Sequence, residues 1–161
     1  MAITRFRGEY FYLSNMYPLV NWIESEQGLF VPTQEHHYMV GRLVDPLLQL
    51  EVALARGDPD DPRVYKDGLA AKDLAHRLIE EGAIQLENWQ VACLGLMSEG
   101  VTKKFNANLD IAQKLYDTGD EEIIEGNTWG DRFWGVDPPG SDNGLNHLGR
   151  ILMNVRANLD I

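Results

Sequence analysis

Two carboxylates and one tryptophan stand out as the residues of this sequence that could break a glycosidic bond. Asp131 and Trp134 lie in the segment Gly-Asp-Arg-Phe-Trp-Gly at residues 130–135, and Glu35 lies far from them in the sequence. Glycosidic cleavage passes through an oxocarbenium-like transition state, which one carboxylate stabilises while another activates water or the leaving group. The residue types fit that chemistry, but without further information the sequence favours the interpretation in which Asp131 caps a turn and Trp134 fills the core.

Metal ligation and cysteine chemistry are weaker interpretations. The run Glu35-His36-His37 would place neighbouring residues on different faces of a helix, and no HExxH pattern accompanies it. The acidic run at residues 58–61 lacks the correctly placed glycine and glutamate of a calcium loop, which favours a solvated loop. Cys93, the single cysteine, lies among apolar residues of an expected helix, where a buried thiol is the default. We therefore expect no metal and no other cofactor.

The length and composition indicate one globular domain. The chain has 161 residues, of which 44% are hydrophobic and 24% are charged, and a chain of this size can bury one core. The single cysteine excludes an internal disulfide framework, and no stretch has the apolar length of a membrane span or the pattern of a secretory leader. We expect a cytoplasmic protein without membrane association.

The net charge bears on the class of ligand. Fourteen basic residues against 25 acidic ones give a formal charge of −11. A protein that holds duplex nucleic acid through phosphate contacts needs a basic footprint, because counterion release supplies most of that affinity. Tight binding to polymeric nucleic acid is therefore disfavoured, whereas a local basic pocket for one nucleotide is compatible with this composition.

The elements that must position these residues are mostly helices. An aromatic strand is expected at residues 5–13 and a hairpin from residues 19–23 and 29–31, after which Thr33 has the character of a helix N-cap. Apolar spacing predicts helices over residues 36–43, 46–56, 67–80, 86–98, 108–116 and 145–159. The fold class is therefore α+β and mainly α, a single compact helical domain over residues 1–161 with a small N-terminal β element.

One long loop combines turn residues with large rings. Residues 127–143 are rich in glycine, proline and aspartate, which disfavours regular structure, yet they include Trp129 and Trp134. Long loops that carry aromatic side chains are often functional sites.

Several segments, in this order, resemble the NADAR domain family, which includes the YbiA-like N-glycosidases. Phe-Arg-Gly-Glu-Tyr followed by Leu-Ser-Asn covers residues 6–15, and Pro-Thr-Gln-Glu-His covers residues 32–36. The later pieces are Ala71-Lys72, Trp89, Met97, Lys104-Phe105 and residues 125–135 and 146–156. Each piece alone is weak, but together they span nearly the whole chain, which is therefore identified as a member of this family.

The resemblance implies a mainly helical fold that cleaves the bond between a ribose carbon and a base-type nitrogen. The functional positions of the family fall on Glu35, Trp89, Asp131 and Trp134. Glu35 or Asp131 would stabilise the ribosyl cation and position water, and the other carboxylate would hold the ribose hydroxyls. Trp134 would stack on the base, which suits a flat leaving group.

The resemblance also implies contacts to the rest of the substrate. The expected substrate-binding residues are Asn15, Lys72, Trp89, Trp129 and Gly135. Lys72 would supply positive charge to a phosphate. Trp89 lies near an expected helix start, where a place in the core is equally compatible with its sequence position.

Several family positions, many of them basic, carry other residues here: Met39, Arg42, Ala75-His76, Leu86 and Cys93. Because most of these changes remove positive charge, a less phosphorylated substrate, or one held differently, is expected. The four functional positions are retained, which favours an active enzyme of altered specificity.

The sequence thus predicts an N-glycosidase that needs no metal or redox cofactor. Its substrate would be a small nucleotide-like molecule, either a riboflavin-pathway intermediate or an ADP-ribosylated base, including one in a single strand. A non-catalytic module that binds ADP-ribose or NAD-like nucleotides is the alternative, and a helical interaction protein is a third. No obligate protein partner is expected.

Overall fold

The computed structural model describes residues 1–161, and most of its regular structure is helical. Six α-helices and one 3-10 helix are joined by loops and by four strands of two residues each. The α+β, mainly α class predicted from the sequence is therefore confirmed. The chain divides into two compact units, residues 15–108 and a second unit of residues 1–14 with 109–161, and each is described by itself. The single-domain organisation stays a prediction.

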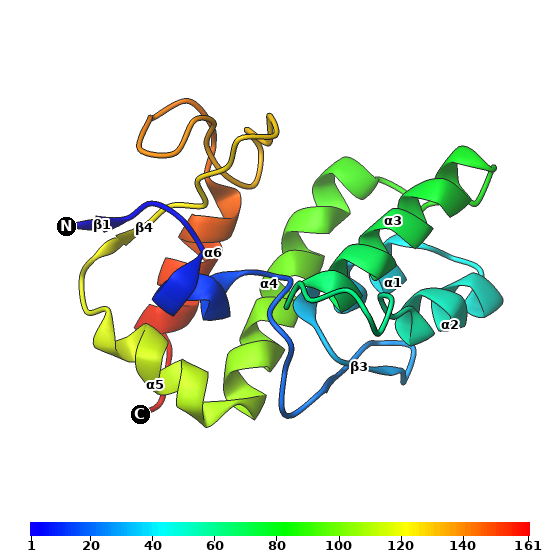
Figure 1. Cartoon of the computed structure of the whole chain (residues 1–161), viewed down its shortest axis with the longest axis horizontal. Helices are drawn as coiled ribbons and strands as arrows, with labels where there is room; N and C mark the ends of the chain where they lie inside the picture. Colours follow the sequence, from blue (N-terminus) through cyan, green and yellow to red (C-terminus); the bar gives the residue numbers. More distant parts are fainter. The chain divides into compact units, whose positions relative to one another are not determined.

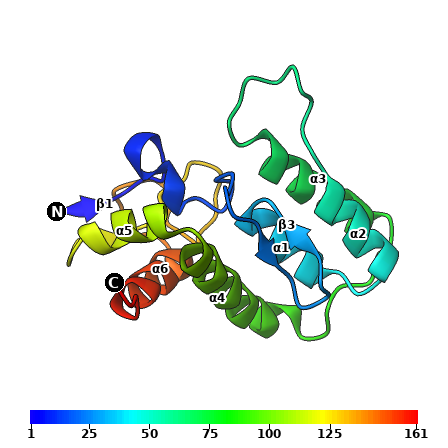
Figure 2. The ribbon, with the colours of Figure 1, turned by 90° about the horizontal axis from the view of Figure 1, so that it is seen from below.

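Four helices form most of the unit of residues 15–108. They are α1 (Gln34–Arg42), α2 (Pro46–Leu54), α3 (Lys66–Glu80) and α4 (Trp89–Ala107). α1 packs against each of the other three helices, and α2 also packs against α3 (Figures 1 and 2). Every residue of α1 except Arg42 is buried, so this helix is the centre of its unit. The predicted positions of α1, α2 and α3 are correct to within two residues.

The predicted hairpin precedes α1. β2 (Ile23–Glu24) pairs antiparallel with β3 (Phe30–Val31), and Ile23 lies opposite Val31. Both of these side chains are buried, and both strands pack against α1. The hairpin is confirmed, although its strands are shorter than the apolar runs suggested.

Thr33 starts α1, as predicted. Its Oγ1 accepts a hydrogen bond from the backbone N–H of His36 at 3.1 Å and lies 2.7 Å from Nδ1 of the same residue. The other ring nitrogen of His36 lies 2.8 Å from the carbonyl oxygen of Ala55. Because a carbonyl only accepts, Nε2 carries the proton and Nδ1 accepts from the Thr33 hydroxyl. Thr33 and His36 together join the start of α1 to the chain that follows α2.

Glycines let α1 and α4 approach each other closely. A Cβ at Gly100 of α4 would overlap the Gln34 amide and would lie 2.7 Å from Nδ1 of His37, and a Cβ at Gly41 of α1 would lie 2.5 Å from a methyl carbon of Leu96. A side chain at either position would force the helices apart or displace these groups. The predicted helix 86–98 in fact starts at Trp89 and continues to Ala107, and it packs on both α1 and β2.

The second unit combines two helices with a pair of short strands. α5 (Leu109–Asp117) and α6 (His147–Ala157) pack on each other, and β1 (Ala2–Ile3) runs parallel to β4 (Glu122–Ile123) beside α6 (Figure 1). The buried apolar residues of this unit include Leu13, Ile111, Leu115, Ile123 and Leu152. The helices predicted over 108–116 and 145–159 are confirmed with small shifts, whereas the parallel strand pair was not predicted.

The predicted strand at residues 5–13 is wrong. Residues Gly8–Leu13 form the 3-10 helix η1, in which the N–H of Tyr10 donates to the Arg7 carbonyl at 3.0 Å. Tyr12 and Leu13 are both buried, although neighbouring residues of a strand would point to opposite faces. The local hydrogen bonds and the burial of both Tyr12 and Leu13 therefore favour a 3-10 helix, although the aromatic composition predicted a strand.

Residues 127–143 contain neither a helix nor a strand, which confirms the predicted irregular loop. No helix in the structure combines the length and apolar character needed to cross a membrane.

Replacement of Thr33 by alanine should destabilise the chain. The variant Thr33→Ala loses the N-cap and leaves Nδ1 of His36 without its hydroxyl, so the free energy of unfolding should fall by about 1–2 kcal/mol. Urea unfolding followed by circular dichroism measures this change. Thr33→Ser keeps the hydroxyl and should stay close to wild type. An alanine variant as stable as the serine variant would show that this cap contributes nothing.

Candidate active site

Glu35 occupies the first turn of α1 in a buried position. Only 6% of its surface is exposed, and its backbone N–H donates to the Asn15 carbonyl at 2.9 Å. The side-chain amide of Asn15 reaches the sulfur of Met97 on α4 at 3.5 Å. The structure thus brings together two predicted site residues, Glu35 and Asn15, although they lie 20 positions apart in the sequence.

Trp89 opens α4 and stands among aromatic and basic side chains. Its ring centroid is 5.1 Å from that of Tyr38, and the guanidinium carbon of Arg42 lies 5.2 Å from its centroid. Arg42 also donates to the side chain of Gln85 at 2.8 Å. Trp89 is half-buried, so one part of its surface packs on α1 while another is accessible to solvent.

A basic cluster adjoins this tryptophan. The Arg42 guanidinium lies 3.5 Å from Nε2 of His76. Burial, followed by the charges of Arg42 and Lys72, lowers the pKa of His76, which is the effect expected of neighbouring cations. Although His76 replaces a basic residue of the family pattern, Arg42 keeps positive charge beside Trp89, and the charge of Lys72 acts on His76.

Lys104 of α4 is a buried amine to which the sequence analysis assigned no role. It is 1% exposed, and its Nζ lies 5.8 Å from the ring centroid of Tyr17 and 5.2 Å from that of Phe105. Burial lowers the pKa of Lys104 to about 7. Such an amine can exchange a proton or act as a nucleophile near neutral pH. Its sequence signal was its helical spacing from the apolar Met97 and Val101, which places a lysine on the buried face.

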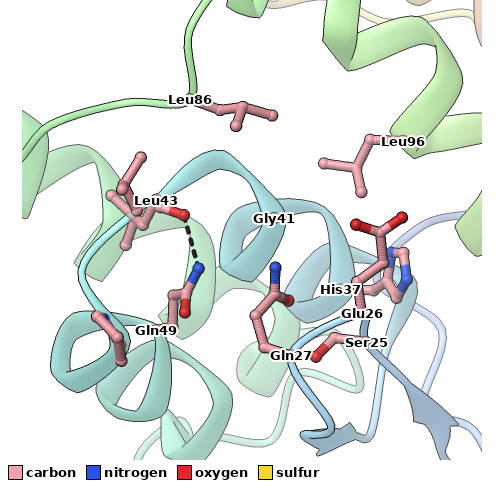
Figure 3. A pocket seen from close by; sticks show the side chains of 11 residues that line it. Ser25, Glu26, Gln27, His37, Gly41, Leu43, Gln49, Leu86 and Leu96 are labelled. Carbon is pink, nitrogen blue, oxygen red and sulfur yellow. Dashed lines mark hydrogen bonds between the residues drawn. The ribbon is translucent and has the colours of Figure 1, made fainter.

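The two histidines that follow Glu35 point to different surroundings. His36 is held by Thr33 and Ala55, whereas His37 lines a cavity of about 410 Å³ on another face of α1 (Figure 3). No group of three or more His, Cys, Asp or Glu side chains in the structure could hold a metal ion. Cys93 is buried, and burial raises the pKa of its thiol, so it is a poor nucleophile at neutral pH.

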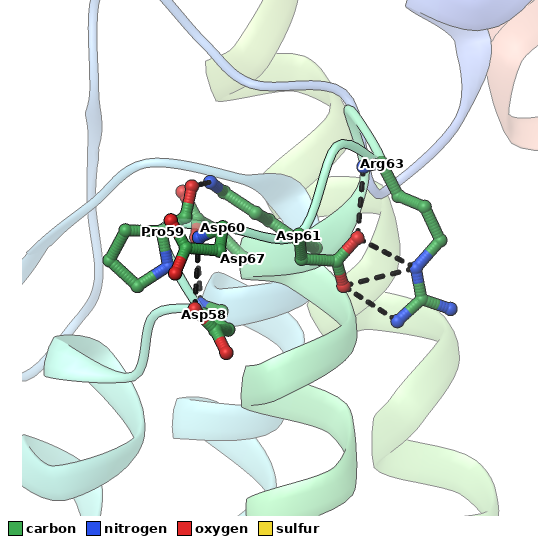
Figure 4. Close-up of polar contacts among 8 residues, drawn as sticks. Asp58, Pro59, Asp60, Asp61, Arg63 and Asp67 are labelled. Carbon is green, nitrogen blue, oxygen red and sulfur yellow. Dashed lines mark hydrogen bonds and ion pairs between the residues drawn. The ribbon is translucent and has the colours of Figure 1, made fainter.

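The acidic loop at residues 58–61 uses its carboxylates within the protein (Figure 4). Asp61 accepts from Nε and Nη2 of Arg63 at 3.0 and 2.8 Å, and this contact lowers the pKa of Asp61 to about 2. The carboxylate of Asp58 accepts the N–H of Asp60 at 2.9 Å. These side chains stabilise turns of the loop.

Asp131 organises the long loop of the second unit. Its Oδ1 accepts from the backbone N–H groups of Phe133 at 3.1 Å and Trp134 at 2.9 Å, whereas Oδ2 makes no hydrogen bond within the structure. The buried amide of Asn127 clamps the same turn, because it accepts from the Asp131 N–H at 3.0 Å and donates to the Asp131 carbonyl at 2.7 Å. One carboxylate oxygen thus holds the turn, and the other remains available for a substrate.

The three other predicted residues of this loop differ in their surroundings. The half-buried Trp134 ring lies 4.8 Å from that of Phe133 in an edge-to-face arrangement, whereas Trp129 is 60% exposed. Gly135 lies directly against Glu125, with which any Cβ would collide. Trp129 presents an open ring, and Gly135 is required by close packing. Glu35 and Asp131 belong to different units, so their cooperation on one substrate stays a prediction.

Comparison with known proteins identifies the family. The family model of the NADAR domain matches residues 4–160, so the chain belongs to the NADAR domain family.

Curated relatives carry two kinds of name. An N-glycosidase of Nostoc punctiforme is 42% identical over 72 residues, which cover 45% of this chain and 44% of that protein. A riboflavin biosynthesis protein of Vibrio vulnificus is 32% identical over 151 residues, which cover 92% of this chain and 35% of that protein. An N-glycosidase of Acanthamoeba polyphaga mimivirus is 30% identical over 77 residues, covering 42% of this chain and 45% of that protein. The matches thus span less than half the length of these curated relatives.

Structural similarity supports the fold. The NMR structure of the Escherichia coli protein YbiA aligns with a TM-score of 0.73 at 20% identity, covering 98% of this chain and 82% of that one. The two chains therefore share a fold.

The buried histidines should make stability depend on pH. Burial lowers the pKa of both His36 and His37 from 6.5 to about 4. As the pH falls, the unfolded chain binds protons at these histidines before the folded chain does. The stability gained by keeping them neutral is therefore complete above about pH 6.5 and is lost as the pH falls towards 4. Lowering the pH from about 7 to about 5 should reduce the free energy of unfolding by about 2 kcal/mol for each histidine. Urea unfolding across this range measures the loss, and His36→Gln should reduce it; an unchanged pH dependence would contradict the assignment for His36.

The turn around Asp131 should depend on an acceptor rather than on a charge. Asp131→Ala removes both side-chain hydrogen bonds, so the Trp134 amide should exchange with solvent at least about tenfold faster. Asp131→Asn keeps the Oδ1 acceptor and should protect that amide as wild type does. Asp142→Ala, an exposed residue of the same loop, is the matched control. Equal exchange in the Asp131→Ala and Asp131→Asn variants would be inconsistent with this turn.

Proposed function

We propose that this chain is an N-glycosidase, a hydrolase of the N-glycosidic bond of a ribosylated or ADP-ribosylated nucleotide-like substrate. Membership of the NADAR family and the names of two relatives support the reaction class. The substrate is proposed to be either an intermediate of riboflavin biosynthesis, in keeping with the name of the Vibrio vulnificus relative, or an ADP-ribosylated base.

The observation that carries the proposal is the burial of the Glu35 carboxylate. It is 6% exposed at the start of a helix whose other residues, apart from Arg42, are also buried. Burying an ionisable side chain costs free energy, so glutamate is rarely buried unless other groups pair with it. A carboxylate in a low-dielectric site interacts strongly with a developing positive charge, which is the requirement of an oxocarbenium-like transition state.

The reaction assigns a distinct task to each group. In one step the bond between the ribose carbon and the base nitrogen breaks, and its electron pair leaves with the nitrogen. A water oxygen bonds to the same carbon, and the proton that water loses returns to the departing base. Glu35 stabilises the positive ribosyl carbon and positions this water, while the free oxygen of Asp131 holds ribose hydroxyls. The Trp134 ring stacks on the flat base.

The cations Arg42 and Lys72, which both act on His76, favour a phosphorylated substrate. Arg42 and Lys72 place positive charge next to His76, and a guanidinium can bind phosphate oxygens through two parallel hydrogen bonds. Because the whole chain carries a net charge of −11, which opposes a polyanion, this local cluster suits one or two phosphates better than a duplex.

Product release should distinguish an enzyme from a binding module. Release of ribose 5-phosphate or ADP-ribose is measured from a phosphorylated riboflavin intermediate, NAD and ADP-ribosylated guanine. Wild type should hydrolyse at least one of them, and Glu35→Gln and Asp131→Asn should each lower kcat/KM by about 100-fold or more. The exposed carboxylates give matched controls in the same two units: Glu51→Gln and Glu122→Gln should retain wild-type activity.

Other outcomes would change the assignment. Saturable nucleotide binding without release from any of these substrates would contradict hydrolysis and favour the binding module. Full activity in Glu35→Gln would remove the buried carboxylate from the reaction. Asp131→Asn preserves the turn geometry, so its loss of activity would report the missing charge rather than a disordered loop.

A further inference from the structure

The unit of residues 15–108 contains a cavity that none of the predicted site residues lines. Its volume is about 410 Å³, which lies within the range of small-molecule pockets, and residues of α1, α2, α4 and the turn after β2 line it (Figure 3). His37 and Gly41 line it from α1. Since each helical residue turns by about 100°, Glu35 and His37 point in nearly opposite directions. The cavity is therefore separate from the Glu35 position.

His37 is an unsatisfied polar group in the wall of this cavity. It is 1% exposed, and neither ring nitrogen has a hydrogen-bond partner. Nδ1 faces α4, where a Cβ at Gly100 would lie 2.7 Å from it. Buried polar groups are almost always paired, so a polar group held in this cavity would satisfy the His37 imidazole.

The charges around His37 determine what it can offer. Glu99 and Lys103 act on it from α4 in opposite senses and pair with each other at 2.9 Å. Burial outweighs both and lowers the pKa of His37 to about 4, so the ring is neutral near pH 7. A neutral imidazole has one nitrogen that donates and one that accepts.

The remaining walls select the chemical class. Leu43, Val44, Leu86 and Leu96 provide an apolar lining, and Glu26 is the charged residue among those that line the cavity. Figure 3 shows the Glu26 carboxylate on the same side as the His37 ring, below Leu96. An anion would meet repulsion here, whereas an ammonium could pair with Glu26 and donate to the accepting nitrogen of His37.

We propose that this cavity is a second ligand site. Its ligand is a small primary amine that consists of a compact apolar body and an ammonium group. The apolar body contacts Leu43, Leu86 and Leu96, and the ammonium lies between Glu26 and His37. The site is independent of the proposed hydrolysis, because it shares no residue with that machinery.

Three probes with the same carbon body test the head group. Isopentylamine, isopentanol and isovalerate carry a cation, a neutral hydroxyl and an anion, and each is titrated into the full chain near pH 7 while the methyl resonances of Leu43 and Leu96 are followed by NMR. Isopentylamine should shift these methyls and the His37 ring nitrogens with a Kd of about millimolar, as its size permits. Isovalerate should cause no shift at these positions.

Two variants separate a specific site from general association. Leu86→Trp places a larger ring at the rim of the cavity, where Leu86 is 39% exposed, and should abolish the shifts while leaving the thermal unfolding midpoint near wild type. Glu26→Gln should weaken isopentylamine by about threefold to fivefold, in keeping with an exposed ion pair. Glu51→Gln, an exposed carboxylate outside the cavity, should bind as wild type does. Shifts that persist in Leu86→Trp, equal binding of isovalerate, or no shift with isopentylamine would each overturn the proposal.

Discussion

The burial of α1 on nearly every side is the constraint on which the unit of residues 15–108 depends. This helix starts with Gln34, Glu35, His36 and His37, four polar residues that are all buried. Burial of polar groups is unfavourable unless neighbouring elements satisfy them or a ligand does. α2, α3 and α4 therefore have to pack around α1 for two reasons at once, to remove apolar surface from water and to provide partners for its polar side chains.

The buried polar residues of α1 and α4 differ in how the unfavourable free energy of their burial is offset. His36 bonds through both ring nitrogens and serves stability. His37 has no partner within the protein and lines a cavity, which is the arrangement of a binding group. Glu35 and, on α4, Lys104 are ionisable side chains held away from solvent, where charges interact strongly with a substrate. One buried helix thus combines structural and functional polar groups because a turn of helix points them to different neighbours.

In the loop of the second unit, a single side chain, that of Asp131, combines a structural with a proposed functional role. Asp131 caps its turn through Oδ1 and keeps Oδ2 free, so the structural and the functional interpretations of this residue are compatible. Asn127 holds the same turn, since its amide bonds to both backbone groups of Asp131. A loop with neither helix nor strand can in this way hold a carboxylate and the Trp134 ring in defined positions.

The sequence by itself determined the helical class, the hairpin, the cap at Thr33 and the irregular loop, because these follow from local propensity, apolar spacing and hydrogen bonds between near neighbours. It also determined the family, whose pattern spans the chain. Only the tertiary structure decided that Arg42 stacks on Trp89 and that Lys104 and His37 are buried. These features depend on contacts between segments distant in the sequence, and burial, which sets the pKa of an amine or an imidazole, is a property of the packed chain.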